Sequence, residues 1–447
     1  MSSNKLLKKL HATIESQSKI IDEQGKIIIQ LKGDVFDLKN EITLLKTKKN
    51  SKNSHTPPSN DQNRPKKNQS LRINTGMQVG GQLGHEGKTL ERRATVDEVI
   101  KYSPDFCTCC GNDLSAVAEA FVASRQVLDI LPVVLQCYEH QTYNKKCSCG
   151  HISEGCFPGY VNAAVQYGPN TEALVGYLHT RQYLPYKRMK EFLNDVMKLP
   201  LSIGGINNIL QRLAQKATPV YDMIKQRIEH SSVVGADETS LNINGKLHWM
   251  WAWQNEKLTY LVASDNRGFK TIEDNFVHGL PKATLNHDRY AAHFKMKTRQ
   301  HQMCTAHLMR DLNYLDELYN GKCNWASDFK QLLLNAAALK KQLTIVQYCQ
   351  QNQRRNDLFK QMDYLLKTTI IDDHGKAKAL QKKLMSQRDA ILYFLLEPHV
   401  PPDNNGSERA IRNIKVKQKI SGHYKSIKGA KLFAILRSII DTAIKSG

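Results

Sequence analysis

The first 46 residues alternate apolar and polar positions with the 3.5-residue period of a coiled coil. Ten of the twelve seam positions are apolar when Leu7 is taken as position a. β-Branched residues at a and leucine at d favour a parallel dimer. Residues 1–46 are therefore predicted to form a leucine zipper, and the alternative is an amphipathic helix packed on its own domain. The a positions are Leu7, Ile14, Ile21, Ile28, Val35 and Ile42, and the d positions are Leu10, Gln17, Gln24, Leu31, Leu38 and Leu45.

The pattern is lost over residues 47–90, which contain few large apolar side chains. Pro57 and Pro58 interrupt a run rich in Asn, Ser and Lys, and four glycines follow around His85. This composition predicts a flexible basic linker. A phosphate-binding loop at the glycines has little support, because no strand precedes them.

Residues 91–160 form a cysteine-rich segment with two short knuckles. Cys107 and Cys110 belong to a CxxCG motif, and Cys147 and Cys149 belong to a shorter CxCG motif. Four thiolates in two knuckles suit a tetrahedral Zn²⁺ ion. The alternative is a set of buried thiols, and Cys109, His151 and Cys156 are substitute ligands. The β-branched and aromatic residues of 127–143 predict a hairpin between the knuckles.

The remainder alternates between helical and strand periodicity. Residues 161–228 are predicted to be helical, with Ser202 as an N-cap. They are compatible with a helix-turn-helix DNA reader and equally with a plain bundle. Residues 229–420 are predicted to be an α/β domain, with short strands at 233–237, 247–253, 259–263 and 283–286 and a helical insertion at about 306–395. Residues 421–447 are predicted to end the chain as a helix.

The amino-acid composition indicates what kind of partner the chain binds. The chain of 447 residues has 64 basic and 42 acidic residues, a formal net charge of +22. Such an excess favours a polyanion such as DNA, although a merely basic enzyme would show the same balance. No secretory signal and no run of apolar residues long enough for a membrane span are found. We therefore expect a cytoplasmic, nucleoid-associated protein whose ten cysteines are thiols or metal ligands.

Three acids stand out by their context. Asp237 ends an apolar strand, Asp288 follows a short strand, and Glu408 lies in the first turn of a helix. Carboxylates at strand ends meet at one edge of a sheet, and they suit Mg²⁺ or Mn²⁺. Two such ions can activate an attacking oxygen and stabilise a leaving one. Spacing alone is weak evidence, since most acids are solvated surface charges.

Basic residues near these acids are candidate DNA contacts. Arg412 and Lys415 share a helix face with Glu408, and Arg409 is its neighbour. A surface pair between Glu408 and Arg412 is the alternative. Lys66 and Lys67 are the candidates in the linker. Cys304 and His307 form a CxxH motif, for which a structural role is expected.

These motifs, in this order, resemble the insertion-sequence sixty-six family of transposases, TnpC type, along nearly the whole chain. The matching segments are the zipper, Gly80–His85, Cys107–Gly111, Leu184–Arg188, Ala236–Thr239, His248–Trp249, Cys304–His307 and, most specifically, Pro402–Arg412. The resemblance implies a multidomain α/β chain: a coiled coil, a small zinc-binding module, a helical DNA-binding region and an RNase H-like catalytic domain with a helical insertion. It also implies that Asp237, Asp288 and Glu408 form a metal-binding DDE triad.

The implied reaction is cleavage at the element's terminal inverted repeats and transfer of the freed 3′-hydroxyl into target DNA. The expected partners are DNA, a second copy of the chain through the coiled coil, and helper proteins of the same element. Arg289 stands where the family commonly has a small residue, the second knuckle is short, and longer members continue past position 447. An inactive or truncated copy that only binds DNA, and a nuclease without strand transfer, are therefore the alternatives.

Overall fold

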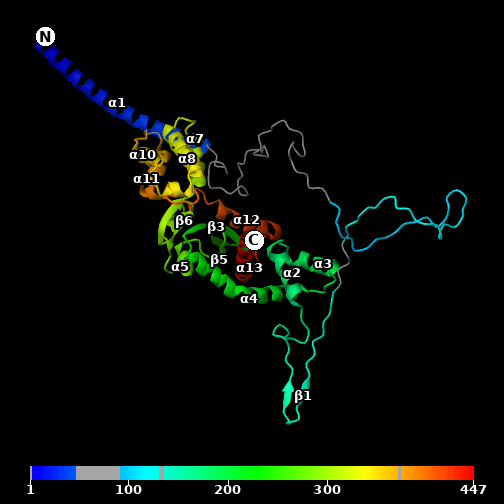
Figure 1. Cartoon of the computed structure of the whole chain (residues 1–447). Helices are drawn as coiled ribbons and strands as arrows, with labels where there is room; N and C mark the ends of the chain where they lie inside the picture. The colour runs from blue at the N-terminus through cyan, green and yellow to red at the C-terminus, as the bar shows by residue number, and fades with distance from the viewer. Residues whose placement is uncertain (1–2, 47–90, 130–134, 371–373) are drawn as a thin grey trace. The chain divides into compact units, whose positions relative to one another are not determined.

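The computed structural model describes residues 3–46, 91–129, 135–370 and 374–447 (Figure 1). The chain divides into two compact units, one of residues 66–136 and one of residues 1–65 and 137–447. The predicted linker, including Lys66, Lys67 and the glycine segment around His85, lies outside the described residues.

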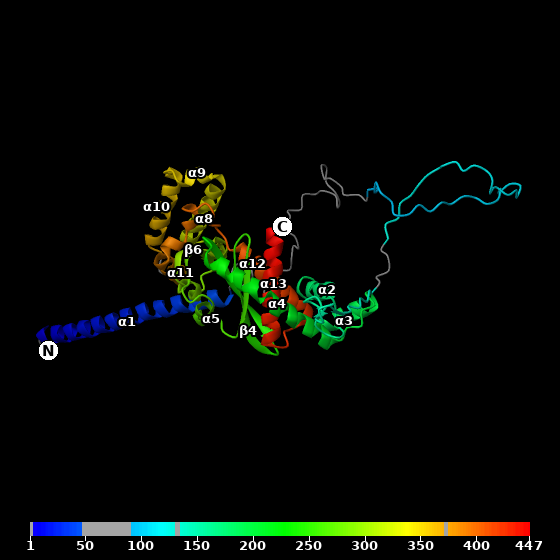
Figure 2. The same cartoon turned by 60° about the horizontal axis from the view of Figure 1, so that its bottom comes forward.

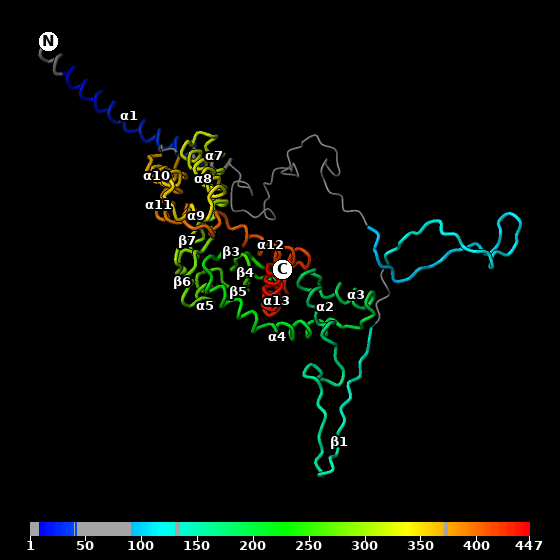
Figure 3. Tube along the Cα trace, viewed as in Figure 1, coloured from blue at the N-terminus to red at the C-terminus, as the bar shows by residue number. Residues whose placement is uncertain are grey.

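The N-terminal helix α1 (Ser3–Lys46) has 44 residues. Figure 3 shows it as a single helix without a break. This confirms the helix that the heptads predict. The described seam side chains are exposed, for example Ile21 at 66% and Leu38 at 57%. An exposed apolar seam is what a helix presents before it pairs with another. The pairing itself remains a prediction.

The predicted hairpin at 127–143 is wrong, because the described residues of that range form no strand. A hairpin instead follows directly in the sequence, where β1 (Asn144–Lys146) pairs antiparallel with β2 (Ile152–Glu154). Its tight connection contains Gly150, whose φ of 89° suits glycine far better than other residues. Turn chemistry therefore decides the hairpin's place over the β propensity of the preceding segment.

Three helices precede the main sheet: α2 (Pro169–Thr180), α3 (Tyr186–Asp195) and α4 (Ile203–Glu229). The Ser202 side chain accepts a hydrogen bond from the backbone N–H of Gly205, which confirms the predicted N-cap. Their apolar faces share a core that includes Val175, Met189 and Ile206. These helices are thus held as one packed layer.

Five strands form a mixed sheet in the order β5-β4-β3-β6-β7. Strands β3, β4 and β5 are antiparallel neighbours, whereas β6 runs parallel to β3 and β7 runs parallel to β6. Strand β7 was not predicted, because its sequence, Thr-Arg-Gln-His-Gln-Met, is polar. The strands are β3 (Val233–Ile243), β4 (Lys246–Gln254), β5 (Thr259–Ser264), β6 (Leu280–His287) and β7 (Thr298–Met303).

Helices cover both faces of this sheet (Figure 2). Val234 and Ala236 of β3 face α4, α5 (Phe269–Asn275) and α6 (Ala291–Phe294), together with Trp251 and Trp253 of β4. Leu241 of β3 belongs to the opposite face, under α12 (Asn405–Ser421) and α13 (Ile427–Ser446). Because strand side chains alternate, Asp237 lies on the α12 side and Glu238 on the α4 side.

The predicted helical insertion separates β7 from α12 and has a core of its own. This mixed α/β arrangement is consistent with the RNase H-like domain that the resemblance implies. No helix in the described part of the chain is long and apolar enough to cross a membrane. The insertion comprises α7 (Thr305–Leu318), α8 (Asn324–Gln342), α9 (Ile345–Tyr348), α10 (Gln353–Lys367), α11 (Gly375–Ser386) and the 3₁₀ turns η1 (Arg388–Ala390) and η2 (Tyr393–Leu395).

Candidate active site

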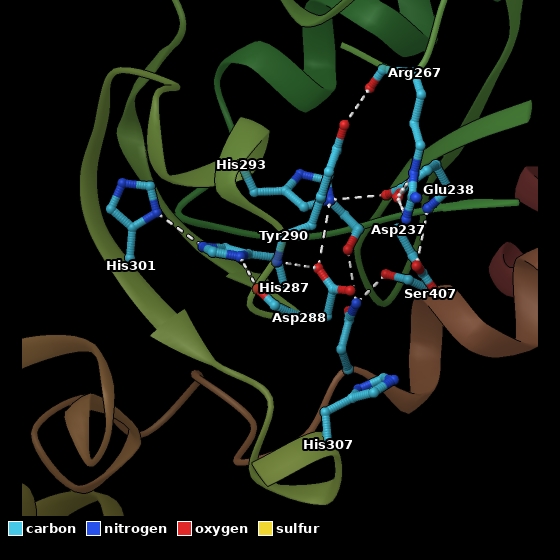
Figure 4. A network of polar contacts seen from close by, with 12 residues as sticks. Asp237, Glu238, Arg267, His287, Asp288, Tyr290, His293, His301, His307 and Ser407 are labelled. Atoms are coloured by element: carbon cyan, nitrogen blue, oxygen red, sulfur yellow. Dashed lines mark hydrogen bonds and ion pairs between the residues drawn. The ribbon is translucent and has the colours of Figure 1, made fainter. Parts of the chain in front are cut away.

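The parallel pairing of β3 with β6 brings the first two acids together. Gly235 is the register partner of Asn286, so Asp237 and Asp288 follow at the same level two residues later. The Asp237 carboxylate accepts a hydrogen bond from the N–H of Glu238 at 2.9 Å. The Asp288 carboxylate accepts one from the N–H of Tyr290 at 2.9 Å. Both carboxylates lie in the network drawn in Figure 4.

Glu408 reaches the same place through the loop that begins α12. Asn404 donates from Nδ2 to the carbonyl of Ala236 at 2.7 Å, and Asn286 donates from Nδ2 to the carbonyls of Pro401 and Asp403 at 2.7 and 2.9 Å. Both amide side chains are buried. They tie the loop to β3 and β6, so the first turn of α12 is held beside the two aspartates.

Carboxylates are crowded in this site. The pKa of Asp237 is raised well above its usual value, first because burial disfavours the ion and then because Glu238, Asp288 and Glu408 repel it. Oε1 of Glu408 is buried without a hydrogen-bond partner among the described residues. Crowded carboxylates with an unfilled oxygen fit a divalent cation.

Helix α7 supplies two basic side chains close to Glu408. Arg310 Nη2 lies 3.6 Å and His307 Nε2 lies 3.8 Å from Glu408 Oε1. These contacts, rather than a pair with Arg412, are the ones that the described residues show. No group of three or more His, Cys, Asp or Glu side chains is close enough to hold one ion in the part of the chain described. Mg²⁺ is commonly held by one or two carboxylates with substrate phosphate, so a tighter cluster is not required.

A second buried network adjoins the aspartates, and the sequence pattern does not predict it. Glu238 Oε2 is 3.0 Å from His293 Nε2, and that nitrogen is 3.9 Å from Asp288 Oδ1. Arg267 donates to Glu238 Oε1 and lies between the rings of Trp249 and Tyr290. The only sequence signal was an acid directly after Asp237. The His293 ring thus lies between the carboxylates of Glu238 and Asp288, as Figure 4 shows.

His287 and His301 extend this network under Asp288. Their rings are joined by a hydrogen bond between His287 Nε2 and His301 Nδ1 at 3.0 Å. Burial lowers the pKa of His287 well below its usual value and lowers the pKa of His301 to about 4. Both rings are therefore neutral at pH 7, and they add no positive charge to the site.

The predicted DNA contacts differ in their surroundings. Arg409 and Arg412 are exposed on α12. Lys415 instead donates from Nζ to the carbonyl and hydroxyl of Ser240 at 2.8 and 3.0 Å, so it holds α12 on β3. Arg289 forms an ion pair with Asp311 of α7. Cys304 has the structural role expected for it, because its Sγ accepts from the N–H of Asn404 at 3.2 Å.

The first cysteine knuckle is a closed backbone turn. Cys107 N–H donates to the carbonyl of Asn112 at 2.8 Å, and Gly111 N–H donates to the carbonyl of Cys107 at 2.9 Å. Gly111 has a φ of 75°. The N–H groups of Cys110 and then Cys109 lower the pKa of the Cys107 thiol. Lowering favours the thiolate that zinc requires.

The second knuckle repeats this turn with one residue fewer. Cys147 N–H donates to the carbonyl of His151 at 2.7 Å, and Gly150 N–H donates to the carbonyl of Cys147 at 2.9 Å. The N–H of Cys149 is the main cause of a lowered pKa at Cys147. Each knuckle, taken by itself, therefore fits a zinc ligand pair despite the short spacing.

Two strand-end carboxylates on a mixed sheet of this order, with a third acid on a following helix, are consistent with the DDE-type transposase domain that a family model identifies in this chain. Residues 164–432 match the model of the transposase IS66 family, and residues 104–150 match the zinc-finger binding domain of transposase IS66. The chain belongs to the IS66 family of transposases. A search of curated proteins found no match.

Proposed function

We propose that the chain cleaves DNA at the ends of an insertion sequence and joins the freed ends to target DNA, with Asp237, Asp288 and Glu408 as the metal ligands. The observation that carries this proposal is the β3–β6 register, which sets two aspartates side by side under the helix that bears Glu408. The family assignment gives the substrate class.

The residues of the site have separate roles in this reaction. When bound, divalent cations activate the attacking oxygen and stabilise the leaving one in an in-line displacement at phosphorus. Asp237 and Asp288 supply ligand charge from the rigid sheet, while Glu408 closes the site from α12. Arg310 and His307 beside Glu408 orient its carboxylate. Exposed Arg409 and Arg412 lie on the same helix as Glu408 and contact DNA phosphates.

The other modules prepare the DNA complex. Two thiolates from each knuckle, Cys107 with Cys110 and Cys147 with Cys149, hold a structural Zn²⁺ in the matched zinc-finger segment. The exposed heptad seam of α1 pairs two copies, so that both element ends are held together. Helper proteins of the same element remain expected partners.

The test is cleavage of labelled DNA carrying the element's terminal inverted repeat, in Mg²⁺ or Mn²⁺. Wild type should nick at the element boundary, and Asp237→Ala, Asp288→Ala and Glu408→Ala should each abolish nicking while DNA binding survives. Nicking that persists in all three variants means that other residues catalyse. Specific binding without any nicking favours a copy that acts only as a DNA-binding protein.

A further inference from the structure

A large open cleft lies beside the start of α12, next to the loop that carries Asn404. Its volume is about 1380 Å³, and its walls come from the ends of α4 and α13, the β4–β5 connection, the loop 398–406 and the start of α12. This exceeds the roughly 300–1,000 Å³ of small-molecule pockets. This size indicates an extended ligand rather than a compact one.

The cleft is strongly cationic. Seven basic and three acidic side chains line it. One of those acids, Asp441, is already paired with Arg437. Arg409 also helps to lower the pKa of Lys445, which falls to about 8 mainly through burial. The cleft therefore carries positive charge that its own acids leave unbalanced.

The lysines and arginines of the cleft have two different roles. Lys445 donates from Nζ to Gln254 Oε1 and to the carbonyls of Asn255 and Leu258, and Lys340 donates to three carbonyls between 394 and 398. These two side chains build the walls. Four exposed basic side chains make no hydrogen bond or ion pair with any other residue that the structure describes; they are Arg181, Arg227, Lys257 and Arg409.

The cleft shares the loop 398–406 and the start of α12 with the carboxylate site. Gly235 lines it two residues before Asp237, and Arg409 lines it one residue after Glu408. A Cβ at Gly235 would lie 2.6–2.7 Å from Gln254, Ser407 and Asn404, so the loop and the strand are in close contact there. A chain of phosphates in the cleft would therefore lie against the loop and the helix start that carry Glu408.

We infer that this cleft binds the phosphodiester backbone of the DNA strand next to the scissile phosphate, through Arg181, Arg227, Lys257 and Arg409. The inference rests on the proposed function for its substrate class, but it assigns a surface that the DDE triad does not include. Guanidinium and ammonium groups bind phosphate, and the donors of these four side chains make no hydrogen bond to any other residue that the structure describes.

The experiment measures binding of a fluorescein-labelled 30-base-pair duplex, and of the same single strand, by anisotropy across a salt series. EDTA is present, so that no cleavage occurs. The variant Arg181→Gln/Arg227→Gln/Lys257→Gln should bind at least about 10-fold more weakly at 150 mM salt, and its slope of log K against log[salt] should fall by about 2–3. The matched control is Lys360→Gln/Lys382→Gln/Lys383→Gln, three exposed lysines of the helical insertion.

Unchanged affinity and slope in the cleft variant would overturn the inference, as would an equal loss in the control. If the thermal transition of the triple variant differs from that of wild type, the single variant Arg227→Gln is used in its place. It should lower the slope of log K against log[salt] by about 0.7–0.9. Nicking of the labelled element end is scored separately. If wild type nicks the DNA and the cleft variant binds DNA normally, only the inference about the cleft is refuted. If wild type does not nick the DNA and the cleft variant binds DNA more weakly, only the proposed function is refuted.

Discussion

The side chain of Asn404 donates a hydrogen bond from Nδ2 to the backbone carbonyl of Ala236 at 2.7 Å. Asn404 is 2% exposed, and its own carbonyl accepts from the N–H of Glu408 at 3.2 Å. The side chain and the backbone of this one residue therefore join the strand that carries Asp237 to the helix that carries Glu408. The distance between the first and third acids of the candidate triad is fixed by this link.

We expect Asn404→Asp to uncouple the two acids. The new carboxylate cannot donate a hydrogen bond to the Ala236 carbonyl, and its oxygen repels the carbonyl oxygen. We expect this to lower the free energy of unfolding by about 1–3 kcal/mol. Nicking of the element end should fall by about 100-fold, while DNA binding is retained. Asn356→Asp, on the exposed face of α10, is the matched control and should behave as wild type. Equal activity in Asn404→Asp would show that the link is dispensable.

Metal binding should be visible in the stability of the protein. Because the pKa of Asp237 is raised in the fold, its carboxylate destabilises the metal-free protein as pH rises through that pKa. Asp237→Asn should therefore raise the thermal midpoint without metal at pH 7. Mg²⁺ at about 100 times its Kd should stabilise wild type by about 2.7 kcal/mol, and the variant should lose most of this gain.

Differential scanning fluorimetry with and without Mg²⁺ measures both effects. Asp328→Asn on α8 is the control, because Asp328 is exposed. Its midpoint and its response to Mg²⁺ should match wild type. A full Mg²⁺ response in Asp237→Asn would mean that the ion binds elsewhere.

His293 should act as a positioning residue for Asp288. It is fully buried between Glu238 and Asp288, at 3.0 and 3.9 Å. Residues behind metal ligands commonly change metal affinity by 10–100-fold. We expect His293→Ala to raise the Mg²⁺ concentration for half-maximal nicking by about 10-fold, and His293→Gln, which keeps a donor toward Glu238, to recover part of it. His278→Ala, at an exposed position, is the control.

A merely structural role of His293 would lower the amount of folded protein without moving the Mg²⁺ midpoint. The titration curve of nicking against Mg²⁺ separates the two, because it is normalised to its own plateau. An unchanged midpoint in His293→Ala, together with a lower plateau, would exclude the positioning role.

The sequence predicted the strands that are apolar and missed the one that is polar. Strands β3 to β6 were found, although each is longer than predicted, because β-branched and aromatic residues mark them. Strand β7 has no such mark: it is an edge strand in which Gln302 is buried through hydrogen bonds to the chain at Met303, Ile391 and Phe394. Such long-range polar partners leave no periodic signal.

The candidate site divides in the same way. Asp237, Asp288 and Glu408 were chosen by their place at strand and helix ends, and the β3–β6 register places the two aspartates at the same level of the sheet. His293 and Glu238 were not assigned, since a contact across 55 positions depends on the packing of α6 against β3. Lys415 was predicted as a DNA contact from helical spacing alone, which could not show that Ser240 already accepts from it.

Zinc content should depend on both knuckles. Cys107→Ser and Cys147→Ser each remove a thiol whose pKa backbone N–H groups lower. Each should reduce bound zinc from about one ion per chain to near zero, because structural sites need four ligands. Cys349→Ser is the control, since Cys349 is an exposed thiol outside both knuckles. Zinc is measured by atomic emission on purified protein, and retention of zinc in either knuckle variant would refute the paired assignment.

Lys417 gives the protein a predictable dependence on pH. Its side chain is 4% exposed, its Nζ lies 3.4 Å from His179 Nδ1, and burial lowers its pKa to about 8. The unfolded chain holds the lysine proton up to pH 10.5 or so, so stability should rise as pH increases from about 8 to 10.5. Below pH 8 the buried ammonium lowers the free energy of unfolding by the full amount that corresponds to the difference between the two pKa values, about 3 kcal/mol.

Lys417→Met should remove this cost. The variant should be more stable than wild type at pH 7 by about 2–3 kcal/mol, and the two should converge toward pH 10.5. Urea unfolding followed through the tryptophans of β4 measures the difference at each pH. Lys419→Met, two positions along α12 and exposed, should keep the wild-type profile. Parallel pH profiles for wild type and Lys417→Met would show that the buried ammonium is fully compensated by the carbonyls of Tyr183 and Leu184, which lie 3.4 and 3.5 Å from it.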